Sequence, residues 1–233
     1  MLNSPDSLLA AGASHALAIG ITTQKENPKQ RHVAIIYKRD DNGFGLIHLG
    51  WHNYFLHQRW DEEYHWVVLP GLDIEQQELF VDWAKLVCMK EPDHPIPYSI
   101  LFRPDGNFDS SGCFISSNDG SGLTCATFVL ALFSDFGIPI AEHTTWPVGR
   151  ENDVSWMNNI LDSLSEYVKS RYPEYLPSIA IQRLQAKALR RFRPEDVVAC
   201  AGLYHDTPIS FDEMHPASLL VVHSLLRARA QSN

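Results

Sequence analysis

The chain has 233 residues, 45% of them hydrophobic, and a formal net charge of −9. This length suits a single α/β domain and allows a hydrophobic core that needs neither a metal ion nor a disulfide. The composition excludes collagen-like, disordered and disulfide-framework proteins. The negative charge argues against nucleic acid as a partner, because affinity for phosphate groups depends on Lys and Arg.

The N-terminal segment is a poor signal peptide, because no basic start precedes its apolar stretch and it contains Asp6 and His15. No run approaches the roughly 18 apolar residues that a membrane span needs. We therefore expect a cytoplasmic protein without a membrane span. An effector exported by a dedicated system would have the same features, and the sequence gives no indication of the oligomeric state.

Strands are predicted in the first third of the chain. Residues 14–23, 32–38, 45–52 and 63–70 have the lengths and the β-branched, apolar composition of strands. Turn residues at 39–43 predict a hairpin between the second and the third of them.

Helical spacing begins at Asp73, which can cap a helix that runs to position 90. An irregular segment rich in Ser and Gly follows over 98–122. Residues 124–137 are apolar on nearly every side, which predicts a helix buried among other elements. The C-terminal third is expected to be helical in three pieces, at 152–170, 178–192 and 216–230. The basic residues within 182–193 are interpreted as a solvated helix face without a function.

The four cysteines form no C-x-x-C pair, which disfavours a zinc ribbon or a redox motif and indicates reduced thiols. Cys125 follows Thr124, a possible helix cap, so its sulfur would lie near free backbone N–H groups that lower a thiol pKa and stabilise an oxyanion. The alternative is a small core residue, the more frequent role of a cysteine on an apolar helix. Cys88 and Cys200 are interpreted as core residues, and Cys113 stays ambiguous.

A nucleophilic thiol also needs a base that is oriented by a third polar group. His32 opens a predicted strand, and His48 lies on the strand expected to pair with it. The two rings can therefore lie side by side across the hairpin, with His48 fixing the tautomer of His32. Taken alone, each is more often an ordinary strand or surface histidine.

Three short motifs occur in an order that resembles the circularly permuted, NlpC-type branch of the papain-like cysteine hydrolases, which includes lecithin retinol acyltransferase-like and PPPDE-type proteins. HVAIIYK at 32–38 resembles the H-x-x-I-Y strand of that family. LIHLG at 46–50 resembles its second histidine strand, and TCATFV at 124–129 resembles its N-C-x-x-F-V helix start. The resemblance covers about residues 14–137.

The resemblance implies a papain-like α+β fold in which an antiparallel sheet packs on helices. The catalytic domain would cover residues 1–150, and a helical extension over 151–233 would pack on the same domain. Cys125 would be the nucleophile, His32 the general base and then acid, and His48 the orienting residue. The reaction would pass through an acyl-enzyme and need no cofactor.

The chain departs from the family pattern, which leaves the substrate open. Thr124 stands where the family usually has Asn, extra residues lie around 40–43, and the C-terminal helices have no recognised counterpart. Relatives act on peptides, isopeptide-linked proteins, peptidoglycan or lipid esters. Without a membrane anchor, we expect hydrolysis of an amide bond in a peptide or protein substrate, rather than lipid acyl transfer or thioester hydrolysis. Tyr98, Trp51 and Thr124 are candidates for substrate binding.

Two further interpretations stay open. Histidines and acidic residues between positions 48 and 65 could hold a metal ion, but His48 and His52 would share a face only on a helix, which Gly50 argues against. The full set is His48, His52, His57, His65, Asp61, Glu62 and Glu63.

Aromatic residues in the same region are interpreted as a surface loop able to line a substrate groove: Trp51, Tyr54, Phe55 and Trp60. The second alternative to a hydrolase or metal site is an inactive papain-like binding module, with the C-terminal helices as its interaction surface.

Overall fold

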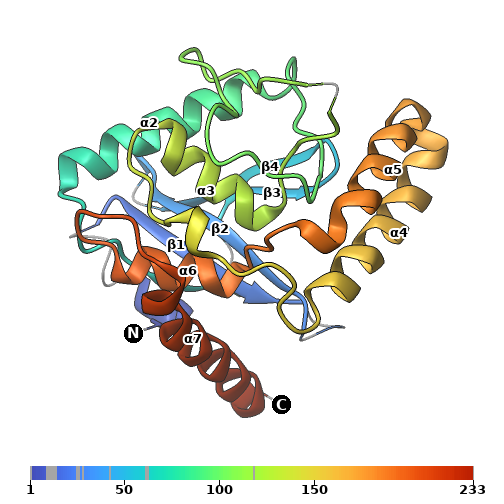
Figure 1. Ribbon diagram of the computed structural model, residues 1–233. Helices are drawn as coiled ribbons and strands as arrows, with labels where there is room; N and C mark the ends of the chain where they lie inside the picture. The colour runs from blue at the N-terminus through green and yellow to red at the C-terminus, as the bar shows by residue number, and fades with distance from the viewer. Residues whose placement is uncertain are drawn as a thin grey trace.

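The computed structural model describes residues 2–8, 15–24, 27, 29–41, 43–60, 63–117 and 119–232. Five strands form one antiparallel sheet in the order β4-β3-β2-β1-β5 (Figure 1). Their bounds are β1 Leu17–Thr23, β2 Arg31–Lys38, β3 Phe44–Trp51, β4 Tyr54–Arg59 and β5 His65–Val67. Together with six α-helices among the described residues, the sheet makes an α+β fold.

The four predicted strands are confirmed: β1 and β5 are shorter than expected, while β2 and β3 each begin one residue earlier. The interpretation of residues 51–60 as a loop was wrong. β3 turns back at His52 and Asn53, and β4 then pairs with β3 from Tyr54 to Arg59. Asn53 has a φ of 50°, a conformation that asparagine tolerates better than most residues. Because β4 is an edge strand with mostly exposed side chains, it lacks the apolar alternation that reveals a strand.

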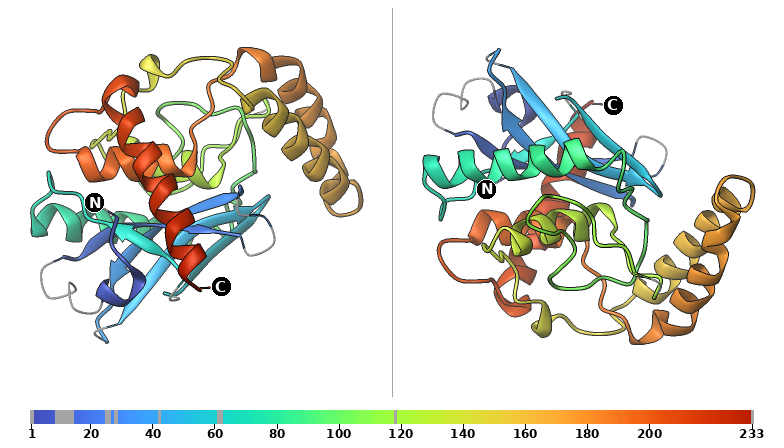
Figure 2. Two further views of the ribbon diagram at one scale, coloured as in Figure 1. Left: turned by 90° about the horizontal axis from the view of Figure 1, so that it is seen from below. Right: turned by 90° about the horizontal axis from the view of Figure 1, so that it is seen from above.

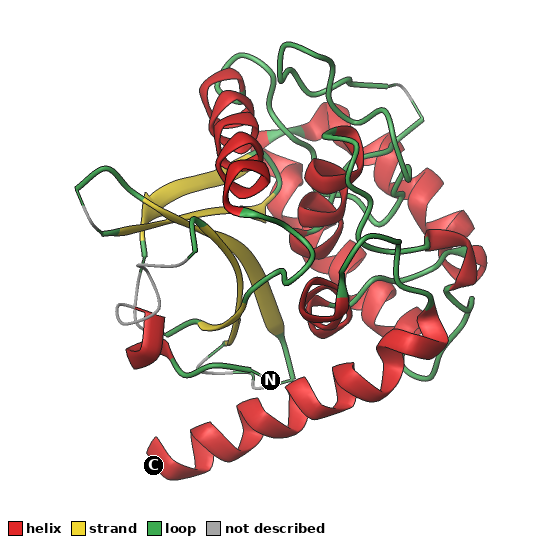
Figure 3. Ribbon diagram, turned by 90° about the vertical axis from the view of Figure 1, so that its left-hand side faces the viewer, coloured by secondary structure: helices red, strands yellow, loops and turns green. Residues whose placement is uncertain are grey.

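Side chains of the central strands alternate between two hydrophobic clusters, as the period of two requires. One set lies in the larger core with the helices: Leu17, Ile19, Ile21, Val33, Ile35, Tyr37, Ile47 and Leu49. The other set lies in a smaller cluster with Leu8, Phe44, Tyr64 and Trp66: Ala18, Ala34, Ile36 and Leu46. Figure 3 shows most of the helices gathered on one side of the sheet.

α2 (Ile74–Lys90) begins as predicted at Asp73, whose carboxylate accepts the N–H of Gln76 at 2.8 Å. α3 (Cys125–Asp135) packs on β2 and β3 and is buried from its first residue. Phe80 of α2 stacks on Phe133 of α3, with ring centroids 4.0 Å apart. The two helices therefore share one core layer against the sheet.

The start of α3 is held next to the segment that contains Tyr98. The N–H of Leu123 donates to the Pro97 carbonyl at 3.0 Å, and the N–H of Ser99 donates to the Leu123 carbonyl at 3.1 Å. A side chain at Gly122 would bring a Cβ to 2.3 Å from the Pro97 oxygen. Glycine at this position is therefore required for the close approach.

The C-terminal segment contributes to the same core. α6, which the sequence analysis missed, lies against β1 and β2 and buries Val197, Val198, Ala199 and Cys200. The expected helix at 178–192 ends earlier, at Gln185. The helices here are α4 Asp153–Arg171, α5 Leu176–Gln185, α6 Pro194–Leu203 and α7 Phe211–Ser232. Short 3-10 turns in the described part of the chain are Pro5–Ser7, His143–Thr145, Pro173–Tyr175 and Ala186–Ala188.

Figure 2 shows α4 and α5 side by side at one end of the molecule, while α7 runs along another side. Among the described residues, no helix combines the length and the apolar character needed to cross a lipid bilayer.

Candidate active site

Cys125 is the first residue of α3, and Thr124 caps this helix. The Thr124 hydroxyl accepts the N–H of Thr127 at 3.2 Å, and the N–H of Thr124 donates to the Thr127 hydroxyl at 2.7 Å. The thiol is buried, and the backbone N–H groups of Val33 and Ala126 are directed towards it. β2 and β3 stop pairing at Ile35 and Ile47, and Val33 of β2, whose N–H is directed towards the thiol, lies beyond this point.

His32 and His48 are joined directly. Nε2 of His32 lies 2.7 Å from Nδ1 of His48, and the ring centroids are 4.8 Å apart at an interplanar angle of 74°. Among the described residues, Nε2 of His48 has no hydrogen-bond partner. If that nitrogen carries the proton of His48, then Nδ1 of His48 accepts from Nε2–H of His32, and Nδ1 of His32 is left as a base.

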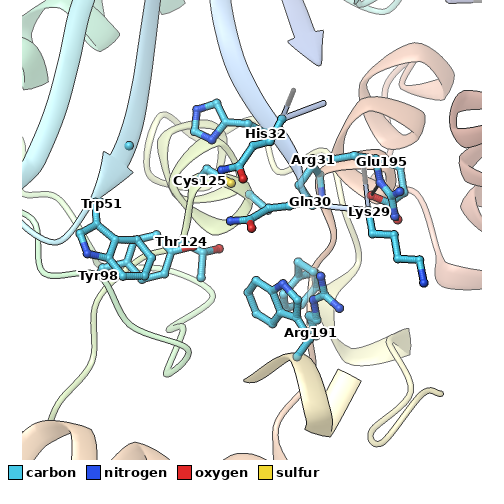
Figure 4. Close-up of a pocket in the computed structure, with 16 residues that line it drawn as sticks. Lys29, Gln30, Arg31, His32, Trp51, Tyr98, Thr124, Cys125, Arg191 and Glu195 are labelled. Atoms are coloured by element: carbon cyan, nitrogen blue, oxygen red, sulfur yellow. Dashed lines mark hydrogen bonds and ion pairs between the residues drawn. The ribbon is translucent and has the colours of Figure 1, made fainter. Parts of the chain in front are cut away.

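Cys125 and His32 line one cleft, together with Trp51, Tyr98 and Thr124 (Figure 4). The structure therefore brings together all the predicted site residues except His48, which contacts the cleft through His32. Within the described part of the chain, no hydrogen bond joins the thiol to an imidazole.

The arrangement of the strands explains why the thiol of Cys125 makes no hydrogen bond to the imidazole of His32. His32 and His48 have the same parity as the side chains of the smaller cluster, and both rings lie beside Tyr64, at 6.5 and 6.4 Å between centroids. Cys125 belongs to the larger core. The thiol and His32 therefore belong to different clusters, and both line the cleft at the start of β2.

Burial controls the ionisation of the site. It raises the pKa of Cys125 to about 11, against the opposing effect of the N–H groups of Val33 and Ala126. It also lowers the pKa of His32 to about 3 and that of His48 to about 4. The expected lowering of the Cys125 pKa is thus wrong, because desolvation outweighs the helix N-terminus. At pH 7 the thiol and both imidazoles are neutral.

The aromatic wall of the cleft is fixed by hydrogen bonds. The Trp51 and Tyr98 rings lie 4.5 Å apart. The N–H of Tyr98 donates to Nδ1 of His52 at 3.3 Å, and its carbonyl accepts from the Tyr175 hydroxyl at 3.1 Å. The buried Tyr98 is therefore held from both sides, which suits a rigid surface for a substrate.

The other half of the cleft was not predicted from the sequence. It carries four charged and two aromatic residues from three distant parts of the chain: Lys29, Arg31, Trp156, Arg191, Phe192 and Glu195. Arg31 donates to Glu195 through Nε at 2.7 Å and Nη2 at 2.6 Å. The interpretation of the basic run as a solvated face was wrong at Arg191 and Arg193, which are largely buried against Asp153.

Three of the four histidines of the metal hypothesis have separate partners, and the buried Nδ1 of the fourth, His65, has none among the described residues. His48 binds His32, His52 accepts from Tyr98, and His57 bonds the Tyr37 hydroxyl. Among the described residues, no three potential ligands converge. Asp61 and Glu62 lie outside the described residues.

The other thiols lie elsewhere. Cys88 donates to the Ala84 carbonyl at 3.0 Å, Cys200 is buried in α6, and the sulfur of the half-buried Cys113 accepts from the Ser111 hydroxyl at 3.2 Å.

Acid is expected to destabilise the protein between about pH 6.5 and 4. Burial lowers the pKa of His48 and His52 to about 4 in the folded protein, from a usual value of 6.5. The unfolded chain therefore binds protons in this interval that the folded protein does not, and the free energy of unfolding falls as the pH falls, by about 1.4 kcal/mol per pH unit for each group at most.

Urea unfolding at about pH 7, 6 and 5 measures this slope. A His52→Asn variant keeps an acceptor for the Tyr98 N–H and should make the slope shallower. A free energy of unfolding that does not change over this range would contradict the prediction.

Comparison of the chain with protein-family models, with curated proteins and with solved structures finds no match.

Proposed function

We propose that this protein is a thiol hydrolase with a papain-like fold that cleaves an amide or peptide bond through Cys125. One observation carries the proposal: the 2.7 Å bond between His32 and His48 ends at the cleft that Cys125 also lines. A nucleophile, a base and a group that orients the base are the parts that acyl transfer needs. The substrate is a peptide or protein.

In the proposed reaction, Nδ1 of His32 takes the thiol proton while the sulfur of Cys125 attacks the carbonyl carbon. The N–H groups of Val33 and Ala126 are candidates to donate to the resulting oxyanion. The C–N bond then breaks, and His32 gives its proton to the leaving amine. Water, deprotonated by His32, attacks the thioester, the C–S bond breaks and the acid leaves, and His32 returns the proton to the sulfur, which restores the thiol.

The raised pKa of Cys125 and the lowered pKa of His32 favour general-base catalysis over a preformed thiolate–imidazolium pair. His48 supports this role, because its Nδ1 can accept from His32 and stabilise the imidazolium that forms. Catalytic hydrogen bonds are often completed only when substrate binds. We place the thiol–imidazole contact in that complex.

A second candidate is an inactive binding module of the same fold. The missing thiol–imidazole hydrogen bond and the raised pKa of Cys125 favour it. A lipid acyltransferase or thioesterase would form the same acyl-enzyme on Cys125 but would use a different acyl donor or acceptor. Its acylation step is therefore the same as that of the proposed hydrolase.

Alkylation of Cys125 by iodoacetamide separates catalyst from binding module. A base-assisted thiol reacts at a rate that is independent of pH above the pKa of His32, so we expect a plateau between about pH 6 and 8. His32→Ala should remove the plateau and leave a rate that rises about tenfold per pH unit, as expected for a thiol with a pKa of about 11. Peptide mass spectrometry measures the rate at Cys125.

His57→Ala is the control, because His57 is also a histidine of the sheet but bonds Tyr37 outside the cleft. It should leave the plateau unchanged. A profile that is the same with and without His32 would support the binding module.

A further inference from the structure

The cleft beside Cys125 is positively charged although the chain is acidic. Among the described residues, Lys29, Arg31 and Arg191 line it against one acid, Glu195, so the excess is three minus one, or two positive charges. The whole chain has a net charge of −9. A concave site with charge opposite to that of the chain concentrates anions.

Arg191 has fewer hydrogen-bonded nitrogens than Arg31, the other arginine that lines the cleft. Arg31 makes a two-bond pair with Glu195. Arg191 uses Nη1 for Asp153, at 3.2 Å, and its guanidinium lies 3.7 Å from the centroid of the Trp156 ring. Its Nε is buried and has no hydrogen-bond partner among the described residues. A buried donor without a partner is costly, and a ligand that supplies an acceptor removes that cost.

Asp153 does not neutralise Arg191 by itself, because it also binds Arg150 and Arg193. Asp196 is the second acid of this cluster and binds Arg150. Three guanidinium groups therefore face two carboxylates, which leaves one positive charge. Burial lowers the pKa of Arg191 to about 10, so that the group is still charged at pH 7.

We propose that Arg191 binds a carboxylate of the substrate close to the scissile carbonyl. With Nη1 engaged by Asp153, Nε and Nη2 form the edge of the guanidinium that can hold a carboxylate through two parallel hydrogen bonds. The exposed Lys29 adds attraction at the rim. The proposed substrates are therefore amides with a free carboxylate near the bond that is cut. This inference rests on the proposed function, which supplies the hydrolysis reaction.

Iodoacetate and iodoacetamide test this arrangement, because they differ mainly in a carboxylate next to the reactive carbon. The ratio of their alkylation rates at Cys125 should exceed the ratio at Cys113 of the same molecule by about tenfold. Arg191→Gln should reduce the Cys125 ratio to that of Cys113, and Arg191→Lys should give an intermediate value. Arg183→Gln removes an arginine that pairs with an exposed acid outside the cleft and should change nothing.

Calorimetry tests the anion site without any reaction. Wild-type protein should bind N-acetylglycine about tenfold more tightly than N-acetylglycinamide, and Arg191→Gln should remove the difference. Equal affinities in the wild type would overturn the proposal, and this comparison needs no variant. Tighter binding of inorganic phosphate than of N-acetylglycine would overturn the assignment of a carboxylate. A Cys125 that resists both alkylating agents would refute the hydrolase, while calorimetry would still decide the anion site.

Discussion

Replacing Asp153 with alanine is expected to lower the free energy of unfolding by about 3–5 kcal/mol. Its carboxylate is 1% exposed and accepts from Arg150 at 3.0 Å, Arg191 at 3.2 Å and Arg193 at 2.8 Å. Without it, three arginines whose side chains are 10–25% exposed would face Asp196 alone. Removing one partner of a buried ion network leaves charges that neither water nor protein compensates.

Urea unfolding of the variant and the wild type at neutral pH measures this loss. Asp162→Ala is the matched control, because Asp162 pairs with Arg183 at 2.7 Å but is 66% exposed. That variant should lose less than about 1 kcal/mol, since an exposed pair is screened by solvent. Equal losses in the two variants would mean that the buried cluster does not contribute as described.

Replacing His32 with alanine is expected to slow the acylation of Cys125 by an activated ester about 10²–10⁴-fold, the usual contribution of a general base. His48→Asn should have a smaller effect, because His48 positions His32 and does not line the cleft. The release of p-nitrophenolate from p-nitrophenyl acetate measures both rates. An unchanged rate in His32→Ala would exclude this histidine as the base.

The elements that were predicted correctly carry their signal locally. Asp73 starts α2 through its own carboxylate, and the apolar run after Thr124 makes α3 a buried helix. The order of His32, His48 and Cys125 along the chain predicted that they lie together, and in the structure His32 bonds His48 and lines one cleft with Cys125. These features depend on neighbours within a few positions, or on a motif.

The features that were missed depend on contacts between distant residues. β4 has mostly exposed side chains, and its pairing with β3 defines it. Arg31 and Glu195 are 164 positions apart and meet because α6 packs on β2. The raised pKa of Cys125 has the same origin, since burial of the thiol depends on the assembled core and not on the capped helix alone.

The most direct test of the central claim locates the acetyl group after a short reaction with p-nitrophenyl acetate. The sulfur of Cys125 should attack the ester carbon, a C–S bond should form as the C–O bond breaks, and p-nitrophenolate should leave. Peptide mass spectrometry should then find a thioester at Cys125 in the wild type and almost none in His32→Ala. An acetyl group at Cys113 instead, or at Cys125 to the same extent in both proteins, would contradict the account.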